Sequence, residues 1–153
     1  MEFSREEFIE KIEALFDSRI EANQDLAFEL MKSQDCIPME LFEQLHPKDW
    51  RVRACLKHGI VEPLKDLPQI NWSILKIEQI PKAIGQLTKL KELDIYNTKI
   101  KELPPEIEGM TGLEGINIST TPISFLPNEL CNLPKLIGSL TVFAKKGKKV
   151  KLV

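Results

Sequence analysis

The chain has 153 residues, of which 42% are hydrophobic, enough for one compact domain or a short capped repeat array but not for two catalytic domains. A formal net charge of -2 with 29% charged residues is ordinary for a globular protein and does not indicate a disordered chain. No apolar run approaches the roughly 18 residues of a membrane span, and the first residues, MEFSREEF, lack the basic and apolar stretches of a secretory signal.

The N-terminal part of the chain predicts a helical, acidic segment. Four helices are expected, over about 4–17, 21–33, 38–45 and 47–58. Ser4 followed by Glu7 forms a capping-box pattern at the first, and Pro47 and Gly59 are expected to open and stop the last. Asp and Glu outnumber Lys and Arg in this head. We therefore expect residues 1–63 to form a helical N-terminal cap with an acidic surface.

The middle of the chain repeats a pattern of apolar residues every 23 residues. The period is set by Leu67, Leu90, Leu113 and Leu136. Three successive segments share seven apolar positions, and in each a proline follows one of these, as in IPKAIGQL, LPPEIEGM and LPNELCNL. The fourth segment fits only after a slip of one residue. Residues 64–142 are therefore expected to form three regular repeats and one degenerate terminal repeat.

This pattern resembles the leucine-rich repeat family, in particular its LPxxI-type repeats, and the head resembles the helical segments of some small bacterial leucine-rich repeat proteins. The resemblance implies an α/β fold: a short solenoid with a parallel sheet on its concave face. Strands are then expected over about 69–72, 92–95 and 115–118. The Asn that caps neighbouring backbone in this family would fall at Leu75, Thr98 and Thr121. Only the two threonines can supply part of that bonding.

The last residues, 143–153, are basic and are expected to form a C-terminal cap strand or hairpin. Val150 and Leu152 alternate with lysines after Gly147. Lysines on an edge strand discourage further strand addition. The Lys145 to Lys149 cluster has a second interpretation, the binding of nucleic acid or another anion, which we consider less favoured because the run is short.

No pattern in the sequence predicts catalysis, a metal or a cofactor. His46 and His58 do not stand at ligand spacing from a cysteine or from each other, and no phosphate-binding loop or hydrolase motif is present. The three cysteines are too few for a disulfide framework and indicate a reducing, cytoplasmic location. One enzyme hypothesis stays open, a thiol enzyme that uses Cys55 with His58 as its base.

The expected function is therefore protein–protein interaction through the concave face. Side chains that alternate with the buried ones on each strand would face the partner. We predict these partner-binding residues to be Gln69, Asn71, Ser73, Glu92, Asp94, Tyr96, Asn117 and Ser119. Tyr96 is the expected anchor, and the two carboxylates favour a basic partner. The alternative is that a protein partner binds the acidic helical head.

Overall fold

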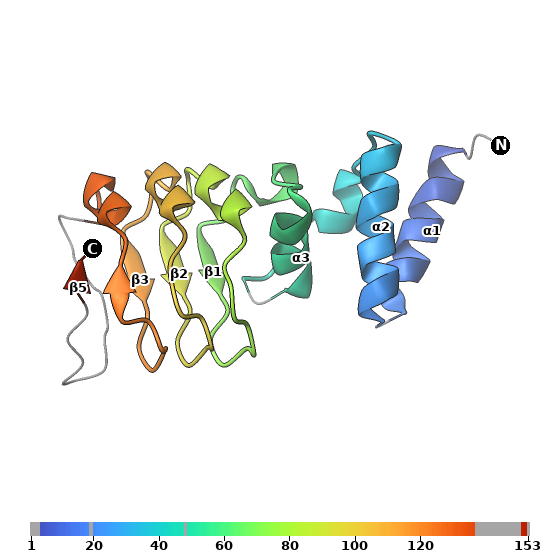
Figure 1. Cartoon of the computed structure of the whole chain (residues 1–153). Helices are drawn as coiled ribbons and strands as arrows, with labels where there is room; N and C mark the ends of the chain where they lie inside the picture. Colours follow the sequence, from blue (N-terminus) through green and yellow to red (C-terminus); the bar gives the residue numbers. More distant parts are fainter. Residues whose placement is uncertain (1–3, 19, 48, 137–150, 153) are drawn as a thin grey trace. The chain divides into compact units, whose positions relative to one another are not determined.

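The computed structural model describes residues 4–18, 20–47 and 49–136, together with the backbone of residues 151 and 152. The chain divides into two compact units, Met1–Gln44 and Leu45–Val153. The N-terminal unit is helical, and the C-terminal unit contains a three-stranded parallel sheet, so the fold is a mixture of α and β structure. Figure 1 shows the order of these elements along the chain.

The N-terminal unit contains helices α1 (Arg5–Asp17) and α2 (Glu21–Ser33) and the short 3₁₀ helix η1 (Met39–Phe42). The expected capping box is present: the Glu7 N–H donates to the Ser4 hydroxyl oxygen, and the Ser4 N–H donates to the Glu7 carboxylate. These two bonds satisfy two backbone N–H donors at the start of α1. Among the described residues, no helix is long and apolar enough to cross a membrane.

Three phenylalanines form the centre of the N-terminal unit. Phe16 lies 5.4 Å from Phe28 and 6.0 Å from Phe42 between ring centroids, the second pair edge to face. All three rings are buried, and such pairs contribute beyond the area they bury. On α2 the buried side chains are Ala27, Phe28 and Met31. The fold of this unit therefore rests on one aromatic cluster contributed by α1, α2 and η1.

The C-terminal unit begins with helix α3 (Trp50–His58) and the 3₁₀ helix η2 (Glu62–Leu64). The expectation that Pro47 opens the helix is wrong. Asp49 is the N-cap, because its carboxylate accepts a hydrogen bond from the Arg51 N–H at 2.9 Å. Pro47 instead accepts a hydrogen bond from the Asn71 N–H with its carbonyl oxygen. Gly59 ends α3 with a φ of 73°, as expected of a C-terminal glycine.

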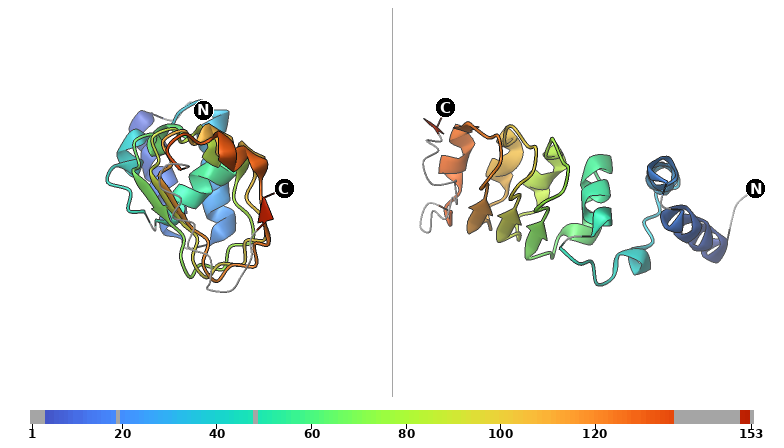
Figure 2. Two further views of the ribbon diagram at one scale, coloured as in Figure 1. Left: turned by 90° about the vertical axis from the view of Figure 1, so that its left-hand side faces the viewer. Right: turned by 90° about the horizontal axis from the view of Figure 1, so that it is seen from below.

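The sheet consists of β1 (Gln69–Asn71), β2 (Glu92–Asp94) and β3 (Gly115–Asn117), paired in parallel in that order. Its register follows the sequence period: Gln69 pairs with Glu92, and Glu92 pairs with Gly115. The strands lie within the ranges expected from the sequence. Figure 1 shows the three strands side by side, and the left view of Figure 2 shows them almost behind one another.

Three 3₁₀ helices stand opposite the sheet, η3 (Lys82–Gln86), η4 (Pro105–Gly109) and η5 (Asn128–Asn132). Each follows a proline at its N-cap, which fixes where the chain turns. Neighbouring helices in this row pack closely. A Cβ atom built on Gly109 would lie 2.2 Å from the Gly85 carbonyl oxygen, so only glycine permits the approach of η4 to η3.

The core of the C-terminal unit lies between the sheet and these short helices. The seven apolar positions of the sequence pattern are buried in every segment, except that Leu67 is half-buried. Burial of each such side chain contributes about 1.5–3 kcal/mol. Lys91 N–H donates to the Pro68 carbonyl, and Glu114 N–H donates to the Lys91 carbonyl. These bonds hold together the residues that directly follow the leucines of the period.

Two short strands form a second sheet near the C-terminus. β4 (Phe125–Leu126) pairs in parallel with β5 (Lys151–Leu152). The final strand expected in residues 143–153 is present over these two residues. Residues 137–150, which include the Lys145 to Lys149 cluster and the expected Gly147 turn, lie outside the described residues.

Candidate functional site

The face of the main sheet opposite the core carries the side chains predicted to bind a partner. Neighbouring strands align these positions in three rows across the sheet. Two rows lie within the paired strands: Gln69, Glu92 and Gly115; and Asn71, Asp94 and Asn117. The third row, Ser73, Tyr96 and Ser119, lies just after the strands at the same 23-residue spacing. All nine residues are exposed or partly exposed, whereas the residues between them on each strand are buried. We call this surface the open face.

The middle row of the open face also stabilises the chain locally. Asn71 and Asn117 each accept a hydrogen bond with Oδ1 from the backbone N–H two residues later, at 3.1 Å. Asp94 does the same with the Tyr96 N–H, at 2.9 Å. This is the Asx turn, which stabilises the bend after each strand. The three residues therefore have a role in the fold.

The central strand gives the open face its charge and its aromatic group. Glu92 and Asp94 are carboxylates, whereas the residues beside them on β1 and β3 are neutral, and no cation occupies any of the nine positions. Tyr96 is 39% exposed and stands between two serines. An exposed aromatic ring beside two carboxylates can bind a basic, partly apolar surface.

The bend after each strand contains one residue with a positive φ. Asn97 has a φ of 54° and Thr120 of 61°, and at the corresponding position of the first segment Ile74 has a φ of 68°. This region is uncommon for residues other than glycine, asparagine and aspartate, and a β-branched residue there is an outlier. Ile74 is also 67% exposed. It is therefore both strained and apolar on the surface.

The residue after this one, Leu75, Thr98 or Thr121, stands where the leucine-rich repeat family has its capping Asn. Only the two threonines make side-chain hydrogen bonds there, as expected. Thr98 and Thr121 are buried, and each hydroxyl donates to the backbone carbonyl three residues earlier, at 2.9 Å and 2.7 Å. Each of these two hydroxyls thus bonds the backbone of its own segment. Leu75, at the same position of the first segment, is 42% exposed. The first segment thus exposes two adjacent large apolar residues where the others have polar ones.

A pocket beside these residues was not predicted. It is a hollow of about 280 Å³ between α3 and the chain after β1, which we call the Trp50 pocket; its main lining residues are Trp50, Arg53, Trp72, Leu75 and Lys76. Trp50 is 38% exposed, and Trp72 is buried. Comparing the first segment with the other two would have shown the unusual Ile74 and Leu75, but the sequence gives no sign that Trp50 lies beside them.

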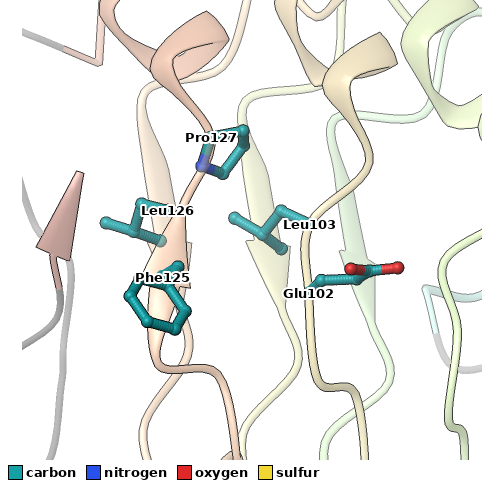
Figure 3. Close-up of a pocket in the computed structure, with 5 residues that line it drawn as sticks. All are labelled: Glu102, Leu103, Phe125, Leu126 and Pro127. Carbon is teal, nitrogen blue, oxygen red and sulfur yellow. The ribbon is translucent and has the colours of Figure 1, made fainter. Parts of the chain in front are cut away.

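A second pocket lies at the other end of the C-terminal unit. Figure 3 shows its lining, Glu102, Leu103, Phe125, Leu126 and Pro127. Leu103 and Leu126 lie side by side, and the Glu102 carboxylate extends away from the Phe125 ring. Glu102 is the sole ionisable group among these residues. One carboxylate in an apolar hollow provides neither an acid–base pair nor a nucleophile with its base.

Cys55, the residue of the thiol-enzyme hypothesis, lies inside α3 and is fully buried. Burial raises the pKa of its thiol to about 12. A nucleophilic cysteine needs the opposite shift, because the thiolate is the reactive form. The environment of Cys55 therefore favours a structural side chain over a nucleophile.

The described residues contain no group of three or more His, Cys, Asp or Glu side chains that could hold a metal ion. Cys36 is partly exposed and Cys131 is exposed, and both are free thiols, as is Cys55.

The Arg51 guanidinium holds the pKa of Asp49 below its usual value through hydrogen bonds and charge, against the effect of burial. Their ion pair, 2.6 Å between nitrogen and oxygen, fixes the start of α3 beside the Trp50 pocket.

Comparison with known proteins adds no assignment: no protein-family model matches the chain, and no curated protein matches it significantly.

Proposed function

We propose that this chain is a leucine-rich repeat protein that binds a protein partner through its open face and has no catalytic role. In this proposal residues 64–142 are the repeats of a short solenoid, and residues 1–63 and 143–153 cap its two ends. Such arrays need atypical ends, because the terminal repeats would otherwise expose their apolar sides.

One observation carries the proposal: the strands pair in a register that equals the sequence period, Gln69 with Glu92 and Glu92 with Gly115. Because the offset is constant, each exposed position repeats across the sheet. The result is an ordered polar surface with an aromatic residue in the middle. Supporting it, the apolar positions of the same period are buried, so the polar side chains are the ones left for a partner.

The chain itself provides matched substitutions for a test. Glu92→Gln, Asp94→Asn and Tyr96→Ser give β2 the side chains that β1 has at Gln69, Asn71 and Ser73. Asp94→Asn keeps the Oδ1 acceptor of the Asx turn and removes only the charge. The triple variant is therefore expected to fold normally while it loses the charge and the ring of the open face.

We expect the wild-type chain to capture a discrete partner from a lysate of its source organism. The triple variant should bind that purified partner at least about tenfold more weakly, since truncation of an aromatic anchor commonly costs more than 1 kcal/mol. Glu10→Gln with Glu13→Gln on α1 is the control for the helical head. Normal binding by the triple variant, with loss of binding by the α1 variant, would assign the partner to the head instead.

A further inference from the structure

The Trp50 pocket is a second surface of the C-terminal unit whose features indicate a ligand. Both tryptophans of the chain line it, and most of its lining is apolar. Leu75, which lines it, and the preceding residue Ile74 are exposed, whereas the next two segments have Asn97 with Thr98 and Thr120 with Thr121 at these positions. Exposed large apolar residues clustered around a hollow are characteristic of binding sites.

The charges around the pocket are mainly positive. Arg53 and Lys76 line it, and neither has an ion pair among the residues that the structure describes. The one carboxylate of the lining, Asp49, is held by Arg51. α3 itself has Arg51, Arg53 and Lys57 and no acidic residue. The pocket thus offers an apolar cavity beside two exposed cations, and its complement is an apolar side chain beside carboxylates.

One residue of the pocket lining contains a buried polar atom without a hydrogen-bond partner among the described residues. The indole N–H of Trp72 has no hydrogen-bond acceptor within the described part of the chain, although the ring is 1% exposed. A buried donor without an acceptor destabilises a fold.

We propose that the Trp50 pocket binds an acidic peptide segment of a partner protein, with one large apolar side chain of that segment inserted between Trp50 and Leu75. The segment's carboxylates then pair with Arg53 and Lys76. This surface is separate from the open face and opposite to it in charge, so the proposal stands even if the open face binds nothing.

The test is selection of a random peptide library on the full-length chain. We expect the enriched peptides to combine a large apolar residue with two or more Asp or Glu nearby. Tryptophan-free versions of these peptides should change the fluorescence of the protein and shift both indole N–H signals in ¹H–¹⁵N spectra, because both tryptophans line the pocket.

Variants locate the binding. Trp50→Ala is expected to weaken it about tenfold or more, and Arg53→Gln with Lys76→Gln about fivefold, as for two exposed ion pairs. Leu75→Thr, which installs the residue found at Thr98, should also weaken it. Lys99→Gln, the counterpart of Lys76 one period later, should have no effect, nor should the triple variant of the open face.

Three results would overturn the proposal. The first is the absence of any enriched peptide, or enrichment of peptides without acidic residues. The second is full-strength binding to the Trp50→Ala variant, or loss of binding in the triple variant, which would place the peptides on the open face. The third is self-association of the chain that Arg53→Gln with Lys76→Gln abolishes, which would make a second copy the occupant.

Discussion

At the residue scale, the positive φ of Ile74 lowers the stability of the folded chain. Asn97 and Thr120 occupy the same bend in the next two segments, and asparagine tolerates this conformation best of the three. Strained residues persist where the surrounding structure holds them, often at functional positions. Because Thr120 is also β-branched, the feature that distinguishes Ile74 is its large exposed apolar side chain next to Leu75, which lines the Trp50 pocket.

Ile74→Asn is therefore predicted to raise the free energy of unfolding by about 1 kcal/mol. The substitution removes the backbone strain of a β-branched residue that has a positive φ. Little burial is lost, because Ile74 is 67% exposed. Asn97→Ile, the reverse change, should lower stability by a similar amount. Urea denaturation of both variants measures the effect, and a destabilising Ile74→Asn would show that the Ile74 side chain packs more than it strains.

Cys55 predicts a pH dependence of stability. Its pKa is raised from 9.0 to about 12 in the folded protein, so above pH 9 the unfolded chain loses a proton that the folded chain keeps. Stability from this group is complete below pH 9 and falls by up to about 1.4 kcal/mol per pH unit as the pH rises towards 12. Denaturation of wild type and Cys55→Ala between pH 8 and about 11 isolates this slope. Parallel profiles would contradict the burial of the thiol.

At the element scale, the row of 3₁₀ helices depends on close backbone contact. Gly109→Ala is predicted to lower the free energy of unfolding by about 1–3 kcal/mol, because the new Cβ would overlap the Gly85 carbonyl oxygen at 2.2 Å. Gly115→Ala on β3 is the matched control, since a Cβ there meets nothing within 4 Å. Equal denaturation midpoints for the two variants would mean that η3 and η4 separate at little cost.

The elements show what the sequence could and could not predict. The 23-residue period was sufficient for β1, β2 and β3, because burial on one face of a strand fixes both its position and its register. It could not predict where α3 begins, since Asp49 and Pro47 are both good starting residues and only the structure shows that the Pro47 carbonyl pairs with β1. The side-chain hydrogen bond of Asp49 therefore sets the start of α3, and the preference for proline in the first turn does not.

The candidate site was also predicted only in part from the sequence. The alternation of exposed and buried residues predicted the open face, but the Asx turns of Asn71, Asp94 and Asn117 required coordinates. The Trp50 pocket was missed because it joins α3 to the bend after β1, and a contact between distant residues leaves no local pattern. Its one visible sign in the sequence is that the first segment has the apolar Ile74 and Leu75 where the next two segments have polar residues.

At the scale of the whole molecule, the C-terminal unit carries two surfaces of opposite character. The open face is acidic around Tyr96, whereas the Trp50 pocket is apolar and flanked by Arg53 and Lys76. Electrostatic complementarity favours different partners, or different segments of one partner, at the two surfaces. A binding module of this size gains affinity when two weak contacts are made by one molecule.

The measurement that tests the open face most directly is site-specific photo-cross-linking. A benzophenone amino acid in place of Tyr96 is predicted to form an adduct with a discrete protein in a lysate of the source organism, and the adduct should disappear when Glu92→Gln and Asp94→Asn are added. The same group in place of Glu13 on α1 is predicted to form none. Adducts from position 13 with none from position 96 would contradict the account.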